Sequence, residues 1–293
     1  MKIIVTGSLG HISKPLTEEL LSKGHNLTVI SSKQNRQEDI EAIGASAAIG
    51  SVDDVHFLAE TFKGADAIYC MIPPNFSEQD QIAYYRHVGK NYIDAIEQAG
   101  VKRVVELSSY GAHLEKGTGF IVGSHYNEEA FDNLKDVVVT HIRPGYFYYN
   151  LLNFASMIKH AGFIGANYGG DDRLLVVSPK DIASAIADEI TQPATRNKIV
   201  YVASDDRSCS DIAKVLGEAI GKPGLEWKTL TNEQMQSGLE ANGFAKALAA
   251  IFVELGEATH KGLLREDYDL NPPVMGKITL EEFAPEFAKT YNQ

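Results

Sequence analysis

The sequence predicts an α/β fold, in which a doubly wound parallel sheet is followed by a smaller C-terminal α/β part. Short β-branched runs alternate with helical patterns through the first half of the chain, an alternation that is typical of parallel sheets. A glycine turn directly follows the first run, at residues 7–10. We therefore expect residues 1–155 to form the sheet domain and residues 156–293 a C-terminal region, some segments of which return to the sheet.

The first stretch, residues 1–24, reads MKIIVTGSLGHISKPLTEELLSKG and is predicted to form a strand, a glycine turn and a helix. Gly7 permits a tight turn, and Gly10 lets the backbone approach a pyrophosphate at the positive end of the helix. The residues predicted to bind a dinucleotide here are Gly7, Ser8, Leu9, Gly10, His11 and Ile12. Because Ser13 replaces the third glycine of the usual G-x-G-x-x-G pattern, a βα turn that binds nothing remains the alternative.

The second strand, at residues 26–30, ends at side chains that bear on the choice of cofactor. Folds selective for NAD place an acidic residue there, whereas NADP folds place basic or small polar groups around the 2′-phosphate. This chain has Ser31, Ser32, Lys33 and Arg36, with no acid before Glu38. The pattern favours NADP(H) over NAD(H). The alternative is that the two basic side chains only solvate a loop.

Strands at residues 45–50 and 67–72 are each followed by a predicted N-cap. Ser51 is expected to begin one helix and Ser77 a longer one, whose tyrosines are assigned to packing. Ligands of a doubly wound sheet bind at the carboxyl ends of its strands. The residues that end the fourth strand should therefore lie against the cofactor, and they are Met71, Ile72 and Pro73.

Strands at residues 101–107 and 137–142 lead to the remaining candidates. Ser108, Ser109 and Tyr110 follow the first strand, and the run RPGYFYYN, residues 143–150, follows the second. Pro144 and Gly145 are expected to shape a turn that passes close to a bound ring, and Tyr146 to stack on it. Further strands are predicted at residues 174–177 and 198–204, and further helices begin near residues 179, 210, 231 and 244.

The pattern V-T-G-x-x-G at residues 5–10 resembles that of the extended short-chain dehydrogenases, and R-P-G-x-F-x-x-N at residues 143–150 is similar to their NmrA-like branch. This branch includes NADPH-dependent quinone reductases and catalytically silent NADPH-sensing regulators. The resemblance covers nearly the whole chain and implies a Rossmann-type sheet. It also implies that Ser51 and Val52 lie beside the adenine, that Ser108 contacts the cofactor, and that Ser109 is near the substrate.

Two departures from these families affect the expected chemistry. No tyrosine is followed by lysine four residues later, so the Tyr-x-x-x-Lys proton relay of the superfamily is absent. The NmrA-like proteins often have lysine three residues before a glutamate where this chain has His125 before Glu128. His125 is interpreted as an acid, a substrate contact or a surface residue.

The leading hypothesis is NADPH-dependent transfer of a hydride to a small flat acceptor such as a quinone, because that chemistry needs no Tyr-Lys relay. The catalytic candidates are His125, Tyr110 and Ser109, and no metal site is predicted. A non-catalytic NADP(H)-sensing regulator is the alternative, favoured by the missing relay. A nucleotide-sugar epimerase fits the fold but requires a tyrosine base that the sequence lacks.

Composition and charge narrow the expected partners. A formal net charge of −12 over 293 residues argues against a general nucleic-acid-binding surface. Neither a leader nor an apolar stretch long enough to span a bilayer is predicted. Cys70 and Cys209 are expected to be buried free thiols. We expect a cytoplasmic monomer or homodimer that binds a small-molecule substrate rather than nucleic acid or a membrane.

Overall fold

The computed structural model describes residues 1–273 and 275–293. The chain divides into two compact units, each assembled from separate segments. The first unit comprises Met1–Ser109, Gly123–Arg143 and Ile182–Val200, and the second comprises Tyr110–Val122, Pro144–Asp181 and Tyr201–Gln293.

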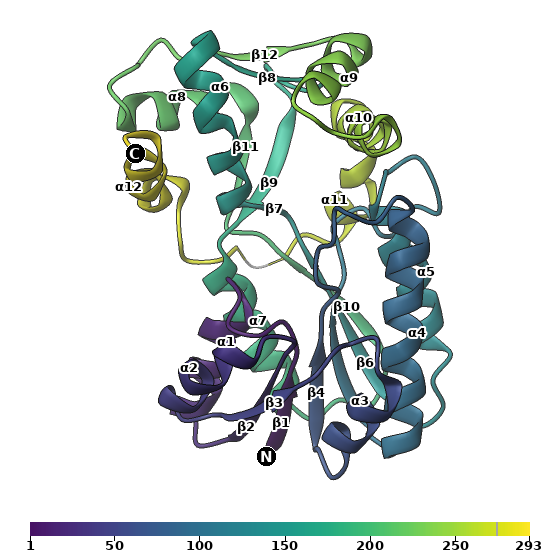
Figure 1. Ribbon diagram of the computed structural model, residues 1–293. Helices are drawn as coiled ribbons and strands as arrows, with labels where there is room; N and C mark the ends of the chain where they lie inside the picture. Colours follow the sequence, from purple (N-terminus) through teal and green to yellow (C-terminus); the bar gives the residue numbers. More distant parts are fainter. Residues whose placement is uncertain (274) are drawn as a thin grey trace. The chain divides into compact units, whose positions relative to one another are not determined.

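A seven-stranded sheet in the order β10-β6-β5-β4-β1-β2-β3 forms the centre of the first unit (Figure 1). The strand pairs from β6 to β3 are all parallel. Because β1 lies between β2 and β4, the chain winds outward in both directions from β1, which confirms the doubly wound fold. The strands are β1 (Lys2–Val5), β2 (Asn26–Ser31), β3 (Ser46–Ile49), β4 (Ala67–Cys70), β5 (Arg103–Leu107), β6 (Val138–Pro144) and β10 (Lys198–Val202).

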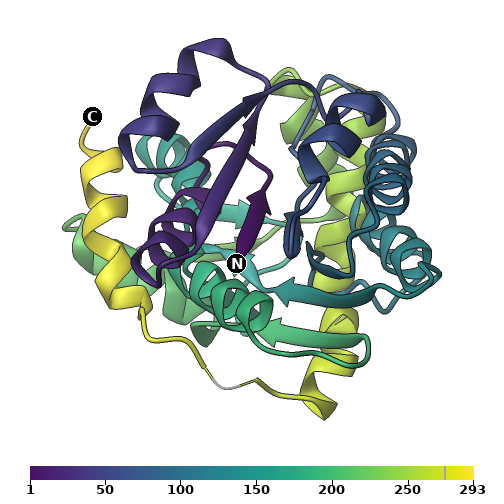
Figure 2. The ribbon, with the colours of Figure 1, turned by 90° about the horizontal axis from the view of Figure 1, so that it is seen from below.

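Helices cover both faces of this sheet (Figures 1 and 2). Helices α3, α4 and α5 lie over one face, and α1, α2 and α7 lie over the other. The β1 residues Ile3, Ile4 and Val5 are fully buried as a result, which explains why this strand reads as a continuous apolar run. The helices are α1 (Ser13–Ser22), η1 (Gln34–Arg36), α2 (Gln37–Ala42), α3 (Val55–Phe62), α4 (Gln81–Ala99), α5 (Ile121–Asp132) and α7 (Pro179–Thr191).

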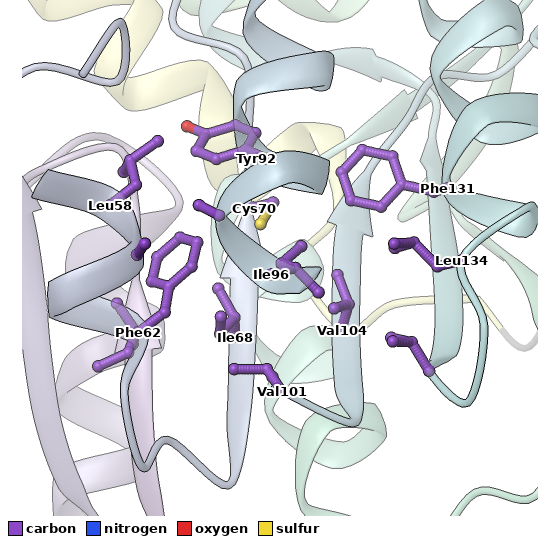
Figure 3. Packing of buried hydrophobic residues seen from close by; sticks show 14 of the residues in the cluster. Leu58, Phe62, Ile68, Cys70, Tyr92, Ile96, Val101, Val104, Phe131 and Leu134 are labelled. Carbon is purple, nitrogen blue, oxygen red and sulfur yellow. The ribbon is translucent and has the colours of Figure 1, made fainter. Parts of the chain in front are cut away.

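The packing between the sheet and α3, α4 and α5 is shown in Figure 3. Ile68 of β4 and Val104 of β5 are fully buried beneath these helices. Tyr92 of α4 also belongs to this cluster and is fully buried, although it carries a phenol. The helix partners labelled in Figure 3 include Leu58, Phe62, Ile96 and Phe131. This cluster fixes α4 against the strands whose carboxyl ends carry the predicted cofactor residues.

The second unit has its own core, which gathers Trp227, Phe287 and Tyr148 among others. Strand β9 is central in a three-stranded sheet of order β11-β9-β7, and β12 pairs with β8. Its strands are β7 (Tyr146–Phe147), β8 (Ile164–Ala166), β9 (Arg173–Val177), β11 (Asp205–Ser208) and β12 (Trp227–Thr229). Its helices are η2 (Tyr148–Phe154), α6 (Ala155–Ala161), α8 (Cys209–Ala219), α9 (Asn232–Ala241), α10 (Lys246–His260), η3 (Leu263–Arg265), α11 (Glu266–Leu270) and α12 (Leu280–Tyr291).

Two predicted N-caps are wrong. Asp54 caps α3 by accepting a hydrogen bond from the Phe57 N–H at 3.0 Å, while the Ser51 hydroxyl accepts from the Asp53 N–H instead. Asp80, not Ser77, caps α4. In both cases the helix begins three residues later than predicted, so the aspartate at that position is the N-cap. Strand β4 ends at Cys70, two residues earlier than expected, and β5 begins at Arg103, two residues later.

Other expectations from the sequence are confirmed. Cys70 and Cys209 are buried free thiols. Pro179 opens α7, with Asp181 in its first turn. None of the helices in the described part of the chain is long and apolar enough to span a bilayer.

Candidate functional site

The turn after β1 has an unusual backbone. Gly7 and Ser8 both adopt left-handed conformations, with φ of 87° and 55°. A serine in this region is uncommon, and such residues cluster at ligand-binding sites. The Ser8 N–H is held by the Ile30 carbonyl at 3.0 Å, and the Gly10 N–H by the Gly7 carbonyl at 3.1 Å. The loop is therefore fixed by its own hydrogen bonds and not only by a ligand.

Ser13 explains how this chain manages without the third glycine of the usual pattern. Its hydroxyl donates to the Thr6 carbonyl at 2.8 Å and so ties the first turn of α1 to the end of β1. A Cβ atom at Gly7 would lie 2.6 Å from the same hydroxyl and 3.0 Å from the Met71 side chain. Gly7 is therefore required both for its backbone conformation and for close packing.

Helix α1 begins without a side-chain cap, whereas aspartates cap α3 and α4. The positive end of a helix favours an anion, although in α1 the Lys14 N–H already donates to the Gly10 carbonyl at 3.0 Å and Pro15 has no N–H. Ile12 is buried. Gly10 and His11 are exposed and Leu9 is half-buried. The turn and the uncapped helix together fit the pyrophosphate of a dinucleotide.

The end of β2 lies beside this turn. The Ser8 hydroxyl donates to the Ser31 hydroxyl at 3.0 Å, and the Lys33 N–H donates to the same oxygen at 3.2 Å. Ser32, Lys33 and Arg36 are exposed. Arg36 pairs with Asp39 at 3.1 Å, but this surface pair contributes little energy, so the guanidinium can turn toward a phosphate at low cost.

The ends of β3 and β4 bring further predicted residues to the same edge of the sheet. Ser51 is exposed and Val52 is half-buried, in the short loop before α3. After β4, the Met71 N–H donates to the Thr6 hydroxyl at 2.9 Å, which joins this loop to the end of β1. Ile72 and Pro73 are half-buried. The predicted phosphate and ring-binding segments after β1, β2 and β4 are thus linked by direct hydrogen bonds.

Ser108, Glu128 and Arg143 form a buried network at the ends of β5 and β6. The Arg143 guanidinium is bidentate to Glu128, with Nη2 to Oε2 at 2.6 Å and Nε to Oε1 at 2.9 Å. The Ser108 hydroxyl also donates to Oε1 of Glu128. Because its hydrogen is committed to Glu128, the Ser108 hydroxyl can only accept a hydrogen bond from a ligand.

His125 lies on α5 one turn before Glu128, and therefore on the same side of the helix. Its side chain is 17% exposed, and its Nε2 atom is 3.5 Å from Oε1 of the exposed Glu129. The imidazole also packs edge-on against Tyr126, with ring centroids 5.6 Å apart. His125 is thus a partly exposed imidazole, and the structure places it against Glu129 and Tyr126.

Ser109 and Tyr110 fall on different units. Ser109 is half-buried at the end of a first-unit segment, whereas Tyr110 begins a segment of the second unit. The Tyr110 N–H donates to the Pro144 carbonyl at 3.1 Å, and its ring packs edge-on against Tyr268. Burial raises the pKa of Tyr110. Burial favours the neutral phenol, so Tyr110 stays protonated.

The turn at Pro144 and Gly145 is packed against the protein itself. The Gly145 N–H donates to the Val202 carbonyl at 3.0 Å, and a Cβ atom there would lie 2.5 Å from the Leu175 carbonyl oxygen. The glycine is therefore required by the close approach of β9. Tyr146 is half-buried in β7 and packs against the core of the second unit.

A buried charge cluster was not predicted from the sequence. His141 of β6 lies between two carboxylates, with Nδ1 at 2.6 Å from Oε2 of Glu106 and Nε2 at 3.1 Å from Oδ1 of Asp132. Burial opposes charge on His141, but the hydrogen bond to Glu106 and the neighbouring carboxylates outweigh it and raise its pKa to about 9. The signal was available, since Glu106 follows the apolar pair Val104 and Val105, and His141 lies beside Ile142 in a buried strand. In residues 1–273 and 275–293, no group of three or more potential ligands could hold a metal ion.

Comparison with known proteins identifies the family. A model described as the NmrA-like family matches residues 1–284. This chain belongs to the NmrA-like family. The resemblance inferred from the sequence motifs is therefore confirmed by a match over residues 1–284.

Relatives and similar structures of this NmrA-like protein span its whole length. An NAD(P)H azoreductase from Xenophilus azovorans is 23% identical over 292 residues, which are 99% of each chain. The NADPH complex of an NADPH-dependent quinone oxidoreductase from Escherichia coli is similar with a TM-score of 0.82 and 20% identity, covering 97% of this chain and 99% of that one. A triphenylmethane reductase from Citrobacter sp., complexed with NADP(H), gives 0.78 and 19%, covering 98% and 99%. At these identities the structural likeness establishes the fold.

Proposed function

We propose that this NmrA-like protein is an NAD(P)H-dependent oxidoreductase that prefers NADPH and transfers a hydride to a small flat acceptor, with quinones first. The observation that carries the proposal is the turn after β1, where left-handed Gly7 and Ser8 precede an uncapped helix at the point where the sheet changes winding direction. The names of the relatives support it, since they describe reductases of quinone, azo and triphenylmethane compounds.

The preference for NADPH rests on the end of β2. The Ser31 hydroxyl is bonded to Ser8 and Lys33, and exposed Lys33 and Arg36 stand close by in sequence. A cation there stabilises the 2′-phosphate of NADPH, whereas NADH selectivity needs a carboxylate that accepts from the ribose 2′-hydroxyl.

A bound nicotinamide supplies the hydride, and the chain's own residues hold the acceptor. Two electrons and one proton pass to the acceptor as hydride, and one further proton from solvent completes a hydroquinone, so no lysine-activated tyrosine is needed. Ser109 and His125 are the side chains that we assign to the developing oxyanion, because donors placed there stabilise it. Tyr110 is placed third, because its ring is buried against Tyr268 in the second unit.

The first test follows the fluorescence of NADPH with the purified protein, before and after addition of quinones, an azo dye and a triphenylmethane dye. We expect enhanced emission on binding, followed by protein-dependent decay with at least one quinone. His125→Ala should then lower kcat by about tenfold while the Kd for NADPH stays unchanged, because the imidazole acts on the acceptor oxygen only. His56→Ala is the matched control, since His56 is an exposed histidine on α3.

If the protein binds NADPH but the NADPH fluorescence does not decay with any of the added acceptors, the second candidate is favoured. That candidate is a non-catalytic NADP(H)-sensing regulator. The absent Tyr-x-x-x-Lys pair is the observation that favours this candidate. Its own test is a pull-down with and without NADPH, in which the set of captured proteins should change. In either case we expect a cytoplasmic monomer or homodimer that binds a small molecule. Size-exclusion chromatography with light scattering measures the oligomeric state.

A further inference from the structure

Two tyrosines of α4 donate hydrogen bonds to the main chain of the loop after β4. The Tyr92 hydroxyl donates to the Met71 carbonyl, and the Tyr84 hydroxyl donates to the Pro73 carbonyl, both at 2.8 Å. The Met71 N–H is in turn held by the Thr6 hydroxyl. Both main-chain polar groups of Met71 are therefore bonded within the protein, which fixes the backbone of this loop.

The same helix also holds the loop after β3. The Asn91 amide donates to the Val52 carbonyl at 3.2 Å, and Asn91 is 6% exposed. One turn earlier on α4, Nε2 of His87 lies 3.3 Å from Oδ1 of Asp53. Three buried or half-buried donors on one helix thus bond carbonyls in the two loops that carry Val52, Met71 and Pro73.

Helix α4 is a rigid frame for these donors. It runs for 19 residues, is capped by the Asp80 side chain, and ends at Gly100 in the left-handed conformation. Tyr92 is fully buried in the core cluster shown in Figure 3. Burial raises the pKa of both Tyr84 and Tyr92, so both phenols stay protonated as donors at any ordinary pH.

We propose that Tyr84, Asn91 and Tyr92 are positioning residues that preset the two loops for the cofactor. The inference rests on the proposed function, because it takes the loops after β3 and β4 to be cofactor contacts. Asn91 would preset the loop on the adenine side, and the tyrosines the loop on the nicotinamide side. Such preorganisation gains affinity by reducing the ordering that binding would otherwise require.

The test measures binding of the whole cofactor and of its two halves by calorimetry. The probes are NADPH, 2′,5′-ADP for the adenine half, and reduced nicotinamide mononucleotide for the other half. The variants Tyr84→Phe and Tyr92→Phe remove one hydroxyl each, and Asn91→Leu removes the amide at similar volume. Tyr85→Phe is the matched control on the same helix, since its phenol is not among the donors to the two loops.

We expect Asn91→Leu to weaken 2′,5′-ADP by about fivefold and to leave the mononucleotide within about twofold, as expected for one lost hydrogen bond. Tyr84→Phe and Tyr92→Phe should weaken binding of the mononucleotide by about fivefold and leave binding of 2′,5′-ADP within about twofold. All three variants should weaken binding of NADPH. Tyr85→Phe should change none of the three. A general loosening of the fold would instead weaken binding of 2′,5′-ADP and of the mononucleotide by similar factors.

Thermal unfolding of each variant separates positioning from stability. The inference is overturned if the wild-type protein binds NADPH but the three variants bind all probes equally well, whether or not their Tm falls. It is also overturned if every variant weakens both halves alike. If the wild-type protein binds none of the probes, the proposed function fails as well.

Discussion

At the scale of single residues, Lys33 is the side chain to which we assign the proposed preference for NADPH. It is exposed immediately after β2, and its N–H is fixed by the Ser31 hydroxyl. Its neighbour in this role, Arg36, already has a carboxylate partner in Asp39. Under the proposed function we therefore assign the 2′-phosphate to Lys33 first and to Arg36 second.

Replacing Lys33 by Met should raise the Kd for NADPH by about tenfold and leave the Kd for NADH unchanged. The variant keeps the aliphatic stem and removes only the charge, and a charge-assisted bond to phosphate is worth about that factor. Fluorescence titration with each nucleotide makes the measurement, and NADH serves as the internal control. Equal loss for both nucleotides would place Lys33 outside the 2′-phosphate site.

At the scale of elements, the Glu128–Arg143 pair joins α5 to the end of β6, and Ser108 joins the same carboxylate to the end of β5. These bonds set where the turn of α5 that carries His125 lies against the strand ends. Both charged partners are buried, so each is costly to leave alone. Glu128 and Arg143 belong to two separate sequence motifs, and only the fold shows that they contact each other.

Removing one partner should destabilise the protein far more than removing both. Glu128→Met or Arg143→Met alone should lower the free energy of unfolding by about 3–5 kcal/mol, because an uncompensated charge stays buried. The double variant should recover most of this loss, since two apolar side chains of similar length fill the space. Urea denaturation measures all three, and additive losses in the double variant would contradict the pairing.

At the scale of the whole molecule, the central sheet carries a charge that makes its stability depend on pH. Both ring nitrogens of His141 face carboxylates, an arrangement that requires the doubly protonated imidazolium. Its pKa is raised from 6.5 to about 9 in the folded protein. The stabilisation is therefore fully present below pH 6.5 and is lost as the pH rises through about 9.

The free energy of unfolding should accordingly fall between pH 7 and pH 10, and His141→Gln should remove on the order of 3 kcal/mol of that fall. The measurement is urea denaturation at a series of pH values. His56→Gln, at an exposed position, should retain the dependence of the wild-type protein. A His141→Gln curve parallel to the wild-type curve would show that His141 is neutral in the fold.

The sequence by itself determined the class of fold and the place of the phosphate turn. Apolar runs such as residues 3–5 and the glycine at position 7 are local signals, because strand burial and left-handed φ impose their residue types directly. The same local reasoning misplaced the caps of α3 and α4, where two acceptors close in sequence compete and the helix start decides between them.

Only the tertiary structure decided which polar groups are already used within the protein. The Ser108 hydroxyl is committed to Glu128, 20 residues away, and the Met71 carbonyl to Tyr92, 21 residues away. From the sequence, Tyr92 was interpreted as a packing residue. The helical period of the apolar residues indicates that its side chain faces the core, but it does not indicate which carbonyl its hydroxyl binds. Hydrogen bonds between distant segments depend on how helices pack on the sheet, and no local pattern in the sequence records that packing.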